Sequence, residues 1–165
     1  MFIISIICII ALVGFDQWTK WLTIAHLKQQ NDIVILEGIF KLTYVENRGA
    51  AFGMLQNQII IFAIFTILTL LAMIVIYYIL PREKSYFPLR VTMVLLFSGA
   101  LGNFIDRMRN GFVVDMFHFH WFEFPVFNVA DILVVVACFT LIYLVLFHYE
   151  EEDLDIKKWL RGPHE

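Results

Sequence analysis

Long apolar runs, separated by short polar segments, dominate the chain. The longest uncharged runs extend from the N-terminus to Phe15, from Ile59 to Leu80, from Val91 to Ile105 and from Ile132 to Phe147. A helix needs about 20 mainly apolar residues to cross a bilayer, and long basic side chains at its ends can reach back to water. We therefore predict four transmembrane helices, at about 2–22, 59–80, 87–106 and 125–147.

Residues 27–56 follow a different pattern. Ile33–Leu36 is a short run rich in β-branched residues, and the apolar side chains of Phe40, Leu42 and Tyr44 then alternate with Lys41 and Thr43. Alternation with a period of two is typical of a strand. We predict a small sheet outside the membrane in 27–56, a loop between the third and fourth spans, and a solvated, partly helical tail over 148–165.

Composition supports a membrane protein. Hydrophobic residues make up 61% of the chain and charged residues 16%, whereas soluble domains average about 45–50% and about 25%. These values exclude a typical soluble domain, a disordered chain and a strongly basic nucleic-acid binder. The predicted fold class is an all-α membrane protein with four transmembrane helices and a small β-rich part.

The placement of the polar residues is more informative than their number. Because successive spans alternate in direction, the end of spans one and three lies on the same side as the start of spans two and four. If the chain has four spans, one face of the membrane holds Asp16, Asn47, Arg48, Asn103, Asp106, Arg107, Asp115, Asn128 and Asp131.

Charge counting leaves the orientation of the chain open. Six Lys and Arg residues fall on that crowded face, and six fall in the turn at 81–90 and the tail. The positive-inside rule needs an imbalance of Lys and Arg to give a direction, and the two counts are equal. The short, basic turn at 81–90 only weakly favours a cytoplasmic location.

Asn128 and Asp131 have two interpretations. An Asn followed three residues later by an acid is the spacing of a helix N-cap with a capping-box partner, which needs no chemistry. The positive end of the helix dipole also favours an ionised carboxylate there, and such a group can act as a base.

The third span ends in Gly99-Ala100-Leu101-Gly102-Asn103-Phe104-Ile105-Asp106-Arg107. The small residues permit close helix packing. Asn103 and Arg107 are four residues apart on one face and can either anchor the helix or hold a peptide backbone. Asp16 and Lys20 have the spacing of a structural ion pair within the first helix.

Asp115 lies among Val113, Val114, Met116 and Phe117. Apolar neighbours predict burial, which raises the pKa of a carboxyl group, and two such carboxyls together can share a proton and activate water. The alternative is a loop acid paired with an arginine. Spacing alone leaves Asp106 an equal candidate for the second carboxyl.

Other classes of function find less support. The five histidines are scattered without metal-ligand spacing, so we expect neither a metal nor a cofactor. A proton- or cation-coupled transporter usually places its key acid near the bilayer centre, where no span of this chain has one. A scaffold whose acids only cap helices remains a further alternative.

Five ordered blocks resemble one known family. They are Asp16-Gln17-Trp18-Thr19-Lys20, Asn47-Arg48-Gly49-Ala50-Ala51-Phe52, the run from Gly99 to Arg107, Val113-Val114-Asp115 and Phe127-Asn128-Val129-Ala130-Asp131. Over about residues 5–148 the chain resembles the bacterial lipoprotein signal peptidases, or signal peptidase II. No catalytic position departs from the family pattern, and the acidic tail lies outside the match.

The resemblance implies a multi-pass enzyme of the bacterial cytoplasmic membrane. Both termini are expected in the cytoplasm, and the active site and a β-rich cradle on the extracytoplasmic side. The resemblance also implies an aspartic endopeptidase whose catalytic pair is Asp115 and Asp131. Supporting or substrate-binding roles are implied for Asp16, Lys20, Asn47, Gly49, Asn103, Asp106, Arg107, Asn128 and Ala130.

The implied substrate is a prolipoprotein signal peptide in which the cysteine carries a diacylglyceryl group, cleaved on the N-terminal side of that cysteine. The expected partners are this substrate and membrane lipid, with no nucleic acid, and we expect a monomer. Because Asp131 begins a helix, we expect it to be the ionised member of the pair and Asp115 the protonated member.

Overall fold

A computed structural model describes residues 2–49, 58–122 and 124–161. It contains four long helices, α1 (Phe2–Leu27), α2 (Ile59–Ile79), α3 (Phe87–Asn110) and α4 (Val129–Tyr143), the last continued by a π-helical turn, η3 (Leu144–His148). All four are long and apolar enough to cross a membrane. The four-helix membrane fold is therefore confirmed. Ala50, Ala51 and Phe52 of the second motif lie outside the described residues.

Several helix ends differ from the expected bounds. The helices α1 and α3 continue to Leu27 and Asn110, a turn or so beyond the predicted spans. The helix α4 begins at Val129 instead of near Pro125, because Phe127 forms a β-bridge with Phe117. Pro125 lacks a backbone N–H, and a proline favours an extended conformation in the residue before it, so it fits a short extended segment ahead of α4.

The sheet has one strand more than the sequence predicts. The strands β1 (Ile33–Leu36) and β2 (Phe40–Asn47) form the expected hairpin, and the antiparallel order is β1-β2-β3. The third strand, β3 (Val113–Phe119), comes from the segment between α3 and α4 that we expected to be a loop. Its first four residues are all buried, so they show no alternation from which a strand could be recognised.

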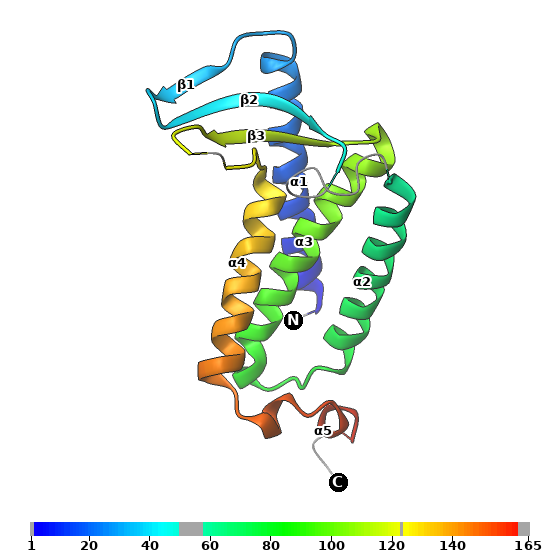
Figure 1. The fold of residues 1–165 in the computed structure, drawn as a ribbon. Helices are drawn as coiled ribbons and strands as arrows, with labels where there is room; N and C mark the ends of the chain where they lie inside the picture. Colours follow the sequence, from blue (N-terminus) through cyan, green and yellow to red (C-terminus); the bar gives the residue numbers. More distant parts are fainter. Residues whose placement is uncertain (1, 50–57, 123, 162–165) are drawn as a thin grey trace.

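The sheet lies at one end of the helices, and the start of α1 and the end of α4 lie at the other (Figure 1). The central helix is α3, which packs against α1, α2 and α4. Large apolar side chains such as Ile60, Phe65 and Phe139 remain exposed on the outer faces. An apolar surface of this extent on soluble proteins is rare, and a lipid bilayer would cover it.

The tail folds back onto the end of the bundle opposite the sheet. Its elements are a 3-10 turn, η4 (Glu151–Leu154), and a short helix, α5 (Ile156–Arg161). The Tyr86 hydroxyl and the Trp159 indole N–H both donate to the backbone oxygen of Asp153, at 3.0 and 2.8 Å. The tail is thus anchored to the 3-10 turn η2 (Lys84–Tyr86) that precedes α3, where we expected a largely solvated end.

Two glycines allow α3 to approach its neighbours closely. A Cβ atom at Gly99 would lie 2.5 Å from the backbone oxygen of Ala130 and 2.7 Å from a methyl group of Val134. A Cβ atom at Gly102 would lie 2.6 Å from a carboxylate oxygen of Asp16. Any side chain at either position would push α3 away from the start of α4 or from α1.

Replacing Gly99 by alanine should therefore destabilise the protein by about 1–3 kcal/mol, the usual cost of overpacking. Gly14→Ala is the matched control, because no atom lies within 4 Å of a Cβ there. In a helix interior the control should be neutral or stabilising by up to about 1 kcal/mol. Thermal unfolding in detergent would test both, and equal stability of the two variants would contradict this packing.

Candidate active site

A buried lysine joins α1 to α3 at the sheet end of the bundle. The Lys20 ammonium lies 2.9 Å from Asp16 Oδ2, 3.0 Å from Asp106 Oδ2 and 2.9 Å from Asn103 Oδ1. Lys20 is 2% exposed, Asp16 0% and Asp106 2%. The ammonium group has three N–H donors, and each can meet one of these three acceptor oxygens. Because every donor has a partner, the burial of the three charges is tolerable. The expected Asp16–Lys20 pair is part of this larger cluster.

The two acids of this cluster also bind backbone groups of other elements. Asp16 Oδ1 accepts the Ala130 N–H of α4 at 2.9 Å, and Asp106 Oδ2 accepts the Val114 N–H of β3 at 3.2 Å. Gln17, to which the sequence assigned no role, donates to Asp106 Oδ1 at 2.9 Å. The only signal in the sequence for Gln17 was the presence of a polar amide side chain within an apolar helix. The cluster thereby fixes the strand and the helix that carry the remaining acids.

Asp131 is held at the first turn of α4 by a capping box. The Asp131 N–H donates to Asn128 Oδ1, and the Asn128 N–H donates to Asp131 Oδ2, both at 3.0 Å. Asn103 Nδ2 donates to the other oxygen, Oδ1, at 2.8 Å. The cap predicted from the sequence is present, and it leaves this carboxyl facing the same space as Asp115.

Asp115 is held by two asparagine side chains. Asn47 Nδ2 of β2 donates to its Oδ2 at 2.8 Å, and Asn128 Nδ2 donates to its Oδ1 at 2.6 Å. Val45 lies directly opposite Asp115 in the sheet register, so Asn47, two residues further, is the diagonal neighbour on the same face. Amide donors thus take the place of the arginine partner considered for a loop acid.

The two carboxyls share one amide network. Asn128 contacts both of them, and its Nδ2 also donates to Asn103 Oδ1 at 3.1 Å. Asn103 in turn binds Asp131 and Lys20. The buried cation cluster and the Asp115–Asp131 pair are therefore connected through Asn103, and the two carboxyls are linked to each other through Asn128.

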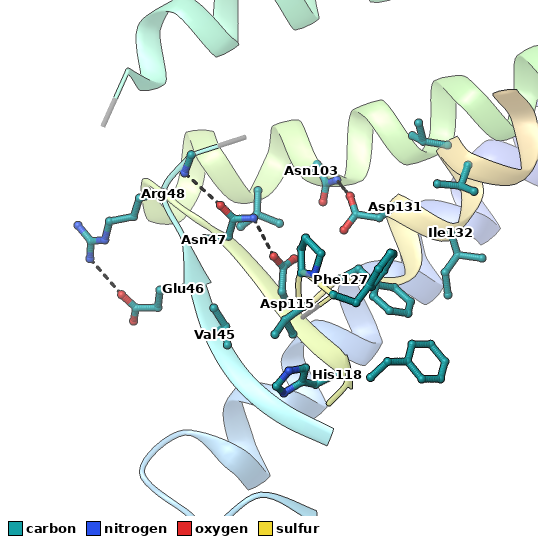
Figure 2. A pocket seen from close by; sticks show the side chains of 18 of the residues that line it. Val45, Glu46, Asn47, Arg48, Asn103, Asp115, His118, Phe127, Asp131 and Ile132 are labelled. Carbon is teal, nitrogen blue, oxygen red and sulfur yellow. Dashed lines mark hydrogen bonds and ion pairs between the residues drawn. The ribbon is translucent and has the colours of Figure 1, made fainter. Parts of the chain in front are cut away.

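Arg107 and Gly49 form a further side of the site. The Arg107 guanidinium donates to the Gly49 backbone oxygen at 3.2 Å, and the Gly49 N–H donates to Asn47 Oδ1 at 3.1 Å. This chain of contacts orients the Asn47 amide so that its NH2 group faces Asp115, as Figure 2 shows.

A cavity of about 1140 Å³ opens beside these groups. Among the described acids only Glu46, Asp115 and Asp131 line it, and Glu46 is already bound to Tyr44, Lys28 and Arg48. Asp16 and Asp106 face the interior cluster instead. Figure 2 shows Asp115 from β3 and Asp131 from α4 pointing toward this space, whereas Asp106 is not among the lining residues.

Much of the remaining cavity wall is apolar. It is formed by Phe119, Phe122, Phe124, Phe127 and the α4 residues Val134–Val136. The cavity therefore combines carboxyl and amide groups with a hydrophobic surface, a combination suited to a ligand with a polar peptide and an apolar part.

Burial raises the pKa of Asp115 to about 7, and the nearby charge of Asp131 adds to this effect. The hydrogen bonds from Asn47 and Asn128 act in the opposite direction, because they stabilise the carboxylate. A carboxyl with this pKa can hold a proton near neutral pH, which is what a general acid requires.

Comparison with known proteins shows the family of this chain. Residues 8–147 match the family described as "Signal peptidase (SPase) II". This chain belongs to the signal peptidase II family. A lipoprotein signal peptidase of Clostridioides difficile (strain 630) is 47% identical over 142 residues, covering 86% of this chain and 94% of that protein.

A second relative and a solved structure are also similar to this chain. The lipoprotein signal peptidase of Streptococcus thermophilus (strain CNRZ 1066) is 39% identical over 147 residues, covering 89% of this chain and 93% of that protein. A structure titled "Bacterial membrane enzyme structure by the in meso method at 2.3 A resolution" has a TM-score of 0.76 at 32% identity, covering 93% of this chain and 91% of that one. The signal peptidase II family comprises membrane aspartic proteases, so the chain is an enzyme of that class and a multi-pass membrane protein.

The pKa of Asp115 offers a direct test of the site geometry. Asp131→Asn should lower it below about 7 by removing the neighbouring negative charge, and Asn47→Ala should raise it by removing a donor to the carboxylate. Infrared difference titration of the carboxyl band would measure both shifts. Glu46→Gln, which removes a cavity acid already bound to other groups, should leave the value unchanged. Shifts of the same sign in the Asp131 and Asn47 variants would contradict the geometry.

Proposed function

We propose that this protein removes signal peptides from lipoproteins, with Asp115 and Asp131 as its catalytic pair. The substrate is a prolipoprotein whose cysteine carries a diacylglyceryl group, and the bond cleaved lies on the N-terminal side of that cysteine. The observation that carries the proposal is that the buried Asp115 and the half-buried Asp131, from different elements, line one cavity and both bind Asn128.

The pair can perform general acid–base hydrolysis. Ionised Asp131 takes a proton from a water molecule while the resulting hydroxide attacks the peptide carbonyl, and protonated Asp115 donates its proton to the carbonyl oxygen. The tetrahedral diol collapses when Asp131 passes its proton to the leaving nitrogen and a diol hydroxyl returns one to Asp115. Both carboxyls then regain their starting states, and the C–N bond has been exchanged for a C–O bond.

The raised pKa of Asp115 supports this division of roles. At the first turn of α4, Asp131 receives hydrogen bonds from the Asn128 N–H and the Asn103 amide, and the helix dipole stabilises negative charge there. These features agree with Asp131 as the base.

The other polar residues position the pair or meet the substrate. Lys20, Asp16 and Asp106 hold α1, α3, α4 and β3 together, and Ala130 supplies the N–H that Asp16 accepts. The amides of Asn47, Asn103 and Asn128 fix the carboxyl orientations. Arg107 and Gly49 line the cavity, where they can satisfy peptide groups of a substrate that has left the helical conformation.

The location of the site fits a substrate anchored in the membrane. The carboxyl pair lies where α3 ends and α4 begins, close to the sheet, and the apolar cavity wall continues down α4. A scissile bond near the interface, with lipid chains and a signal helix extending into the bilayer, matches this layout. The protein acts as a monomer in the bacterial cytoplasmic membrane, with the site on the extracytoplasmic side and both termini in the cytoplasm.

Replacing either carboxyl should abolish the reaction. Asp115→Asn and Asp131→Asn should each reduce cleavage of a diacylglyceryl-modified prolipoprotein by at least about 100-fold, the lower range for loss of a general acid or base. The assay follows release of the signal peptide by the purified enzyme in detergent. Glu46→Gln, in the same cavity, should change the rate by no more than a few-fold.

Two outcomes would contradict the proposal. Turnover close to that of the unmodified enzyme in either Asp variant would show that the pair is wrongly assigned. Equal cleavage of the same prolipoprotein without its diacylglyceryl group would show that the substrate class is wrong, even if both Asp variants are inactive.

A further inference from the structure

A second cavity lies at the opposite end of the bundle, where α1 begins and α2 ends. Its volume is about 480 Å³, and it is lined by Phe2, Tyr77, Tyr78, Leu80, Arg82 and Arg90. None of these residues belongs to the carboxyl site, which lies beside the sheet at the other end of the helices (Figure 1). The cavity therefore needs an explanation of its own.

Arg90 is a buried cation whose charge is not balanced. It is 6% exposed, and one of its nitrogens donates to the backbone oxygens of Leu80, at 2.8 Å, and Pro81. Its guanidinium carbon lies 5.3 Å from the centre of the Tyr77 ring. Its Nε is the one buried side-chain nitrogen or oxygen without a hydrogen-bond partner in the part of the chain that the structure describes.

No described acid compensates for the two arginines. All the ion pairs found among the described residues are formed by Lys20, Lys28, Lys41 and Arg48. A buried charge without a counter-ion is unfavourable, and so is a buried N–H without an acceptor. An anion in the cavity would supply the missing counter-charge, and a phosphate group matches the donors of two guanidinium groups.

The rest of the cavity wall identifies the source of the phosphate. Phe2, Tyr78 and Leu80 are apolar or aromatic, and the helices that continue from them expose Ile3 and Val75 along the lipid-facing surface. Tyrosines at a helix end are typical of the level of the lipid headgroups. We propose that this cavity binds the phosphate of an anionic membrane phospholipid through Arg90 and Arg82, with the acyl chains lying along α1 and α2.

The proposal can be tested by native mass spectrometry of the full-length protein in detergent. Phosphatidylglycerol should bind at least about tenfold more tightly than phosphatidylcholine with the same acyl chains, as expected for charge-assisted hydrogen bonds. Arg82→Gln should weaken binding of phosphatidylglycerol about tenfold and leave phosphatidylcholine unaffected. The control Lys84→Gln removes one exposed positive charge from the same turn, outside the cavity lining, and should change either affinity by less than about twofold.

A second variant tests the buried group. Arg90→Lys keeps the charge and replaces the planar guanidinium by a single ammonium group, so it should also weaken phosphatidylglycerol binding, with thermal unfolding as the check of its fold. If Arg90→Lys does not fold, the phosphatidylglycerol affinity of Arg82→Gln, compared with that of Lys84→Gln, is sufficient to test the proposal.

Three results would overturn the proposal. The first is equal affinity for the two lipids, and the second is equal weakening by Arg82→Gln and Lys84→Gln, which would indicate only a general effect of positive charge. The third is displacement of phosphatidylglycerol by millimolar inorganic phosphate, which would identify a site for free phosphate instead of lipid. None of these results depends on cleavage activity.

Discussion

The ion cluster around Lys20 is the interaction on which the rest of the active end depends. One ammonium group, buried between α1 and α3, contacts Asp16, Asp106 and Asn103. The two acids bind the backbone of α4 and β3. Removing one partner would leave a buried charge without compensation, which typically costs about 3–5 kcal/mol. This rigidity matters because acid–base catalysis needs its carboxyls held in place.

From this cluster the network extends to the catalytic groups by way of asparagines. Asn103 contacts Lys20 and Asp131, while Asn128 contacts Asp131 and Asp115. A neutral amide can donate and accept hydrogen bonds at the same time. The asparagines can therefore hold the carboxyls in position relative to the Lys20 cluster without adding charge. That property suits a site in which one carboxyl has to hold a proton while its neighbour is ionised.

Local patterns predicted part of this arrangement. The four apolar runs predicted the four long helices, and the spacing of Asn128 and Asp131 predicted the cap that is present at α4. The strand β3 escaped prediction because Val113, Val114, Asp115 and Met116 are all buried, and a strand covered on both faces has no alternation. Contacts such as that between Gln17 and Asp106 depend on tertiary packing, which spacing along the chain cannot show. The proposal of Asp115 and Asp131, with Asp106 outside the pair, rests on the family resemblance and is supported by the cavity lining.

The central claim is that Asp115 and Asp131 act together on one reacting group. The most direct measurement is a crystal structure with a peptide-like inhibitor that carries a hydroxyl group in place of the scissile carbonyl. The account predicts that this hydroxyl oxygen lies within about 3 Å of both carboxyls, the distance of a hydrogen bond. A hydroxyl that contacts only one of them, or that lies beside Asp106, would contradict the account.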